Sequence, residues 1–84
     1  MAGREGIGLA EAVAAHAFGI ATADLPTQSE ARSVAAYLAH RVLRIAPSSR
    51  AAAACKRIEA RRRDPQFDRM IGWLETLLRS AVAA

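Results

Sequence analysis

The stretch that most constrains the fold lies at residues 50–63, where a block of alanines is enclosed by basic residues. Four consecutive alanines favour an α-helix, because alanine loses no side-chain entropy on entering one. At helical spacing, Ala51, Cys55 and Ile58 share one apolar seam. The residues on the flank of this seam, three basic and two small, are Arg50, Arg57, Arg61, Ala53 and Ala54. The stretch predicts a helix with a narrow core seam and a basic stripe that permits close approach.

The length of the chain limits the size of its core. With 84 residues, the sequence predicts one small domain over residues 1–84, with frayed ends at 1–7 and 81–84. A core of this size is modest, so we expect well-packed helices or a partner to complete the stability of the domain.

Charge is concentrated in the middle third of the sequence. Residues 32–63 carry nine lysines or arginines and a single acidic residue, while the net charge of the whole chain is +4. Such a concentration is typical of a surface that binds nucleic acid or an acidic partner. The alternative interpretation is an arginine-rich face that is simply solvated.

The sequence carries no pattern typical of an enzyme. It has no glycine-rich phosphate loop, its acidic residues are scattered over different predicted helices, and its serines lie at predicted helix starts, where capping explains them. Cys55 lies on the apolar seam, where a thiol acts as a small hydrophobic group. We therefore expect no catalytic activity, no cofactor and no metal site.

The single cysteine and the hydropathy pattern bear on location. One cysteine excludes an intramolecular disulfide, which fits a reducing compartment. The N-terminus lacks the apolar stretch of a signal peptide, and no run reaches the roughly 18 apolar residues of a membrane span. These features predict a cytoplasmic protein that does not enter membranes.

Start and stop residues predict four helices, near residues 8–18, 28–45, 48–63 and 65–80, and a single turn near 22–25. Gly19 is placed to end the first helix as a left-handed glycine. Thr27 and Glu30 have the spacing of a capping box for the second. The expected caps of the third and fourth helices are Ser48 or Ser49 and Asp64, which precedes Pro65. No strand pattern appears, so the predicted fold is a small all-α domain of four helices.

The last predicted helix has the heaviest apolar stripe in the sequence. The predicted core residues are Val34, Leu38, Ile58, Phe67, Ile71 and Leu74. Met70, Trp73 and Leu77 widen the stripe beyond what three short alanine-rich helices are expected to cover. A surplus apolar patch on a small protein often marks an interface. We therefore predict self-association into a homodimer through the last helix.

Two stretches of the sequence resemble motifs of a known bacterial family and occur in the order in which that family has them. Residues 32–38 match a helix of Arg-x-x-Ala-x-Tyr-Leu form, and residues 54–59 match the end of a His-Ala-Cys-Arg-Lys-Ile-Glu type run with its two basic residues exchanged. Together they resemble the C-terminal DNA-binding domain of the replication initiator DnaA, over about residues 9–78. The resemblance implies a helix-turn-helix domain that binds double-stranded DNA in replication or transcription control.

The sequence departs from this family where the family reads DNA bases. The basic loop that enters the minor groove corresponds to residues 26–29, which include no basic residue, and the base-reading histidine corresponds to Ala53. The connection between the second and third helices is shortened to residues 43–49. The resemblance thus implies a truncated helix-turn-helix with reduced sequence specificity.

Six basic residues are the predicted DNA contacts: Arg41, Arg44, Arg50, Lys56, Arg57 and Arg61. Such side chains bind phosphates and give salt-dependent affinity without reading bases. The alternative function is a helical protein-interaction module that has lost DNA binding and binds an acidic partner or a second copy of itself.

Overall fold

A computed structural model describes residues 3–83. Over this range the chain forms α1 (Gly3–Phe18), the 3-10 helix η1 (Thr22–Thr27), α2 (Ser29–Leu43), α3 (Ser49–Arg61) and α4 (Pro65–Ala83), and no strand. The predicted all-α class is confirmed, and the predicted single turn near 22–25 is the 3-10 helix. No helix among these is long and apolar enough to cross a membrane.

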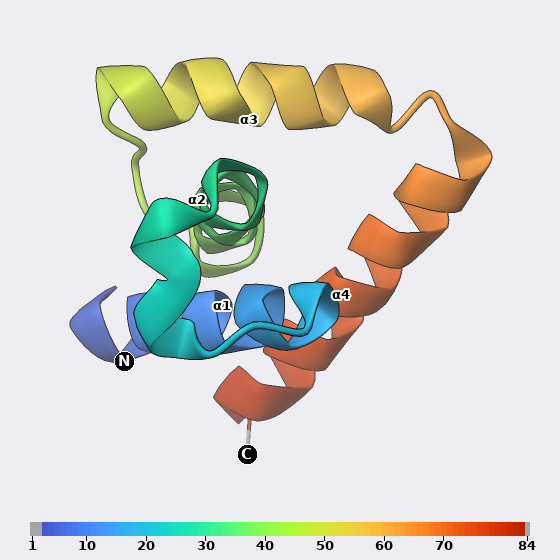
Figure 1. Cartoon of the computed structure of the whole chain (residues 1–84). Helices are drawn as coiled ribbons and strands as arrows, with labels where there is room; N and C mark the ends of the chain where they lie inside the picture. Colours follow the sequence, from blue (N-terminus) through green and yellow to red (C-terminus); the bar gives the residue numbers. More distant parts are fainter. Residues whose placement is uncertain (1–2, 84) are drawn as a thin grey trace.

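The second α-helix is the centre of the arrangement. It contacts each of the other three α-helices. In Figure 1, α2 is seen nearly end-on, with α3 above it, α1 below it and α4 running diagonally at the right. Because α1 and α3 lie on opposite sides of α2, the basic helix α3 is attached to the domain mainly along one side.

The core is shared by all of these helices. Its largest fully buried side chains are Val34, Tyr37, Leu38, Ile71, Leu74 and Leu78. All six predicted core residues are buried, which confirms that prediction. Buried alanines such as Ala14 of α1 and Ala31 of α2 permit these two helices to approach closely.

The end of α1 follows the predicted glycine signal. Gly19 adopts a left-handed conformation with φ of 66°. Its N–H donates to the carbonyl of His16 at 3.1 Å, and the N–H of Ile20 donates to the carbonyl of Ala15 at 3.0 Å. This pair of hydrogen bonds is the Schellman arrangement, in which glycine avoids the steric cost of a Cβ atom.

The predicted starts of α3 and α4 are also confirmed. The Ser48 hydroxyl oxygen accepts a hydrogen bond from the N–H of Ala51 at 3.2 Å. The Asp64 carboxylate accepts one from the N–H of Gln66 at 3.0 Å, directly before the helix that opens with Pro65. Both caps satisfy backbone donors that have no partner within the helix.

The predicted capping box at the start of α2 is wrong. Thr27 belongs to η1, where its hydroxyl donates to the carbonyl of Asp24 at 2.8 Å. Gln28 occupies the N-cap of α2 without a side-chain hydrogen bond. The carboxylate of Glu30 is instead bound to Arg61 of α3. The 3-10 helix thus takes up the residue that the capping box required.

Several predicted bounds are also wrong. Helix α1 begins at Gly3 and α4 continues to Ala83, so both helices extend beyond the predicted bounds of 8 and 80; residues 1, 2 and 84 lie outside the described range. Gly6 is buried and Val82 packs against the core, which extends both helices. In contrast, α2 stops at Leu43 because Arg44 turns left-handed with φ of 61°, and α3 stops at Arg61 instead of 63.

Candidate nucleic-acid interface

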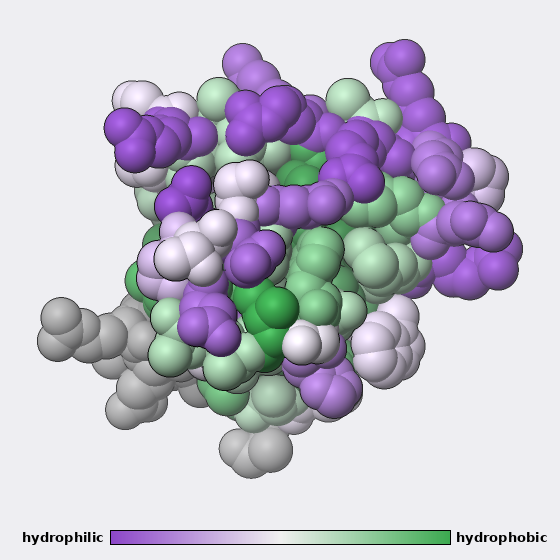
Figure 2. Space-filling view, in the orientation of Figure 1, coloured by the Kyte–Doolittle hydropathy of each residue, from purple (hydrophilic) through white to green (hydrophobic). Residues whose placement is uncertain are grey.

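Helix α3 presents one buried side and one exposed side. Cys55 and Ile58 of the predicted seam are buried and Ala51 is half-buried, while Ala54, predicted on the flank, is buried as well. The exposed side carries one acidic residue, Glu59, and otherwise mainly basic and small residues: Arg50, Ala53, Lys56, Arg57 and Ala60. Figure 2 shows hydrophilic side chains gathered along the top of the molecule, where Figure 1 places α3. The exposed side is therefore a basic ridge with small residues at its centre.

A groove of about 370 Å³ lies between α2 and α3. Arg32 of α2 and Arg50 and Arg57 of α3 line it, and these three arginines define what we call the α2–α3 groove. Serine hydroxyl groups from Ser29, Ser33 and Ser48 also line it. Among the residues that the structure describes, no acidic side chain contributes to its walls. The groove therefore combines positive charge with hydroxyl groups.

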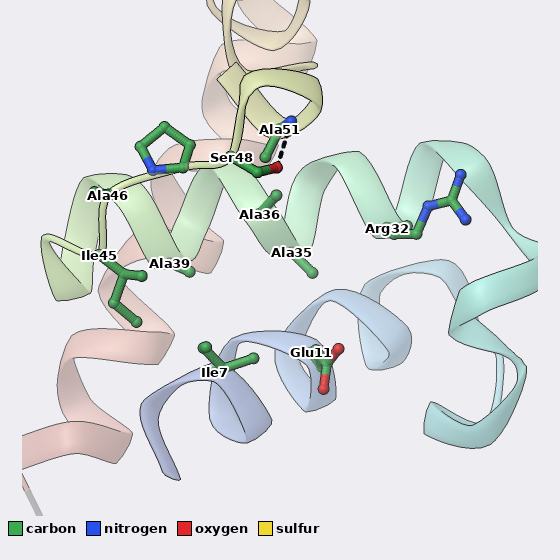
Figure 3. Close-up of a pocket in the computed structure, with 11 residues that line it drawn as sticks. Ile7, Glu11, Arg32, Ala35, Ala36, Ala39, Ile45, Ala46, Ser48 and Ala51 are labelled. Atoms are coloured by element: carbon green, nitrogen blue, oxygen red, sulfur yellow. Dashed lines mark hydrogen bonds between the residues drawn. The ribbon is translucent and has the colours of Figure 1, made fainter. Parts of the chain in front are cut away.

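Arg32 is the member of this groove that the sequence analysis missed. One of its guanidinium nitrogens donates to the carbonyl of Pro26 at 2.9 Å, which holds the side chain in place. In Figure 3, Arg32 extends from α2 away from α1, on the side where Ser48 and Ala51 lie. Its spacing on α2 gives no sign of this role, because only the docking of α3 brings the three arginines together.

Two of the six predicted DNA contacts are already engaged within the protein. The Arg61 guanidinium pairs with the Glu30 carboxylate and lies 4.1 Å from the centre of the Phe67 ring. The Nε atom of Arg41 lies 3.7 Å from a carboxylate oxygen of Glu75. Part of the positive charge that the sequence counts is thus neutralised by neighbouring helices.

The remaining predicted contacts do not form one continuous face. Arg50 and Arg57 meet in the α2–α3 groove, whereas Lys56 lies on the other flank of α3, in a hollow of about 280 Å³ that it shares with Tyr37 and Glu59. Arg44 is exposed at the end of α2. The structure therefore brings Arg50 and Arg57 together in the α2–α3 groove, where it adds Arg32, and places Arg41 and Lys56 in the separate hollow.

A partly buried polar network joins α2, α3 and α4 beside the Lys56 hollow. The guanidinium of Arg62 donates to both carboxylate oxygens of Glu75 at 3.3 Å and to Asp68 at 2.6 Å. It also donates to the Tyr37 hydroxyl oxygen at 3.0 Å, while the Tyr37 hydroxyl donates to Glu59 at 2.5 Å. Only 6% of Glu75 is exposed. The network fixes the position of α3 relative to α2 and α4.

This environment changes the acidity of three groups. Burial raises the pKa of Tyr37, and its hydrogen bond to Glu59 raises it further. Burial lowers the pKa of Arg62, but hydrogen bonds to Tyr37 and Asp68 and the charge of Glu75 raise it overall above its ordinary value. Burial also raises the pKa of the Cys55 thiol. Cys55 is therefore a poor nucleophile, since the thiolate is the reactive form.

An apolar hollow of about 230 Å³ lies between α1, α2 and the connection to α3. Figure 3 shows Ile7 of α1 facing the alanines of α2, with Ile45 at one end and Glu11 and Arg32 toward the other. Its lining offers apolar contact and no histidine or cysteine. Within residues 3–83, no group of three or more metal-ligating side chains lies close enough to hold an ion.

Comparisons of this chain with protein-family models, with curated proteins and with solved structures found no match.

Proposed function

We propose that this chain is a non-catalytic DNA-binding module that contacts the phosphates of double-stranded DNA through α3, with little dependence on base sequence. The observation that supports it best is the exposed ridge of α3, where Arg50, Lys56 and Arg57 form no ion pair within the described part of the chain. Lysine and arginine side chains without an ion-pair partner can bind DNA phosphates, and the release of counterions condensed on the DNA favours this binding.

The shape of α3 supports the same proposal. A helix of 13 residues is about 20 Å long, enough to lie along several phosphates. Ala53 and Ala60 are exposed on α3 and have short side chains, so the longer basic side chains of the helix project beyond them. Alanine at these two positions cannot hydrogen-bond a base edge, and we propose that the neighbouring basic side chains contact phosphates.

The resemblance to the DnaA C-terminal domain adds a proposed role. The Arg-x-x-Ala-x-Tyr-Leu pattern falls on α2 and the second motif falls on α3, the two helices that line the α2–α3 groove. On this basis we propose a helix-turn-helix type module that acts in replication or transcription control and has lost most of the family's base reading.

Salt-dependent binding tests this proposal. Fluorescence anisotropy would be measured with a random duplex and a DnaA-box duplex over a range of salt concentrations. The double variant Arg50→Ala/Arg57→Ala is expected to weaken both duplexes alike and to reduce the slope of log affinity against log salt by about two units, one for each lost phosphate contact.

A charge-matched control uses two exposed arginines of α4. The variant Arg69→Ala/Arg79→Ala changes the net charge equally and is expected to leave the affinity nearly unchanged. Absence of binding to any duplex at low salt would contradict the proposal. A preference for the DnaA box of a hundredfold or more, roughly 2.7 kcal/mol, would contradict its low sequence specificity.

An exposed apolar ridge supports the alternative function, a protein-interaction module. Trp73 is 56% exposed and Leu77 is 36% exposed, and their spacing of four places them on one side of α4. Because large apolar side chains are costly to hydrate, this ridge favours contact with another protein surface. We propose a second copy of this chain as that partner.

A further inference from the structure

We propose that the α2–α3 groove is a binding site for a phosphate group, supplied either by a DNA backbone or by a free phosphorylated molecule. The first supporting observation is the charge of its walls. Arg32, Arg50 and Arg57 line one groove from two helices. Their mutual repulsion is uncompensated by any acidic side chain of the lining. An anion in the groove would relieve that repulsion.

The acidic residues nearest in the structure are engaged elsewhere or face another hollow. Glu30 lies in the adjoining hollow beside Arg57 and is bound to Arg61. Glu11 of α1 lines the apolar hollow, which adjoins the groove and shares Arg32 and Ser48 with it, but within the described residues no ion pair joins Glu11 to Arg32. The positive charge of the α2–α3 groove is therefore open to a ligand.

The groove is also arranged to donate hydrogen bonds. Arg32 is held by its contact with Pro26, so less freedom is lost when it binds. The Ser48 oxygen accepts from Ala51, which leaves its own hydrogen available to a ligand. The first turns of α2 and α3 line the groove at Ser29 and Arg50, and the positive ends of both helix dipoles therefore favour an anion there.

The floor and the guanidinium groups select the kind of anion. Ala36, Ala51 and Ala54 line the base of the groove, so a ligand meets no long side chain before it reaches the arginines. Guanidinium groups bind phosphate oxygens in pairs, which gives both affinity and orientation. The site therefore suits a phosphate ester. The site does not require DNA as its ligand, because a free phosphorylated molecule presents the same phosphate oxygens as a DNA backbone.

The test is a titration of the isotope-labelled full chain with inorganic pyrophosphate, followed by amide NMR shifts. We expect saturable shifts in residues 29–33, 48–51, 54 and 57. Arg32→Gln should weaken pyrophosphate binding at least tenfold, with a similar loss for Arg57→Gln. Arg32→Lys should recover only part of the affinity, because lysine keeps the positive charge but lacks the paired N–H donors of a guanidinium group.

Controls and a DNA arm separate this proposal from the proposed function. Arg69→Gln, on α4, should leave pyrophosphate binding unchanged, and circular dichroism checks that each variant is folded.

If pyrophosphate displaces duplex DNA, the groove holds a backbone phosphate. If pyrophosphate binds and DNA does not, the site is supported for a free phosphorylated ligand while the DNA function fails. If pyrophosphate shifts no groove amide, or Arg32→Gln binds it normally, the site is refuted even where DNA binding depends on Lys56.

Discussion

Tyr37 illustrates how much one side chain carries in a domain of this size. Its ring is buried in α2, and its hydroxyl donates to Glu59 and accepts from Arg62. Burial and the Glu59 hydrogen bond raise its pKa above 10.0. Since it is the only tyrosine in the sequence, its ionisation can be followed without overlap. We expect an absorbance titration to give a midpoint above 10 in the native protein and about 10 in concentrated guanidinium.

The sign of the stability change follows from this shift. The neutral hydroxyl is favoured in the folded state, so its contribution is complete below the unfolded pKa of about 10 and is lost as pH rises through the folded pKa. Tyr37→Phe should be less stable at neutral pH, because Glu59 and Arg62 each lose a hydrogen bond, but should show a smaller alkaline loss. A native midpoint at or below 10 would show that the hydroxyl is solvated.

At the scale of elements, the connection between α3 and α4 depends on a buried ion pair. Arg62 at the end of α3 binds Glu75 of α4, and removing the arginine alone would leave a buried carboxylate with Arg41 at 3.7 Å. We expect Arg62→Met to cost about 3 kcal/mol in the free energy of unfolding, since the buried carboxylate would keep only the half-exposed Arg41 as a partner. Urea unfolding followed by circular dichroism measures this cost.

The matched variants identify the cause. Arg62→Met/Glu75→Leu should recover most of the lost stability, because two apolar side chains of similar size replace the pair. Arg63→Met removes a neighbouring exposed arginine and should change the stability by less than about 0.5 kcal/mol. If the double variant is less stable than Arg62→Met, the pair is not the source of the effect.

Helix spacing predicts most of these elements and even contains a signal for the network. The four helices and the six core residues follow from apolar spacing and caps, because these are local properties. Arg62 lies four residues after Ile58 and Glu75 four after Ile71, so each extends an apolar seam with a charge of opposite sign. That coincidence on two helices indicates a buried pair.

The α2–α3 groove could not be predicted in this way. Arg50, Arg57 and Arg61 share one predicted stripe, yet Arg61 is neutralised by Glu30 while Arg32 joins the other two. Both outcomes depend on how α2 and α3 cross, a tertiary property that helical spacing does not contain. The left-handed Arg44, which shortens α2, is likewise invisible in the spacing, because a glycine would be the ordinary signal there.

At the scale of the whole molecule, the two proposed functions use different surfaces. The basic ridge and the α2–α3 groove belong to α2 and α3, whereas the apolar ridge of Trp73 and Leu77 belongs to α4. A homodimer formed through α4 would therefore place two basic surfaces in one particle. Two linked surfaces bind DNA with higher avidity than one, provided that both reach the same duplex.

This arrangement leads to a prediction about self-association. Trp73→Glu/Leu77→Glu should weaken dimer formation at least tenfold, because both apolar contacts would be replaced by charges that must be desolvated. Sedimentation over a range of concentrations measures the dimer. As Trp73 is the only tryptophan in the sequence, its fluorescence should also shift to shorter wavelength as the concentration rises.

Arg79→Glu provides the control on the same helix. Arg79 is exposed on α4 and, two residues from Leu77, does not face the apolar ridge, so this change alters the net charge by the same two units away from the ridge. We expect Arg79→Glu to dimerise nearly as well as the natural sequence and the Trp73→Glu/Leu77→Glu variant to keep its helical content, since both replaced side chains are exposed. A monomer of 9.0 kDa at high concentration, with unchanged tryptophan emission, would rule out α4 as a dimer surface. The exposed Trp73 would then point to a different protein partner.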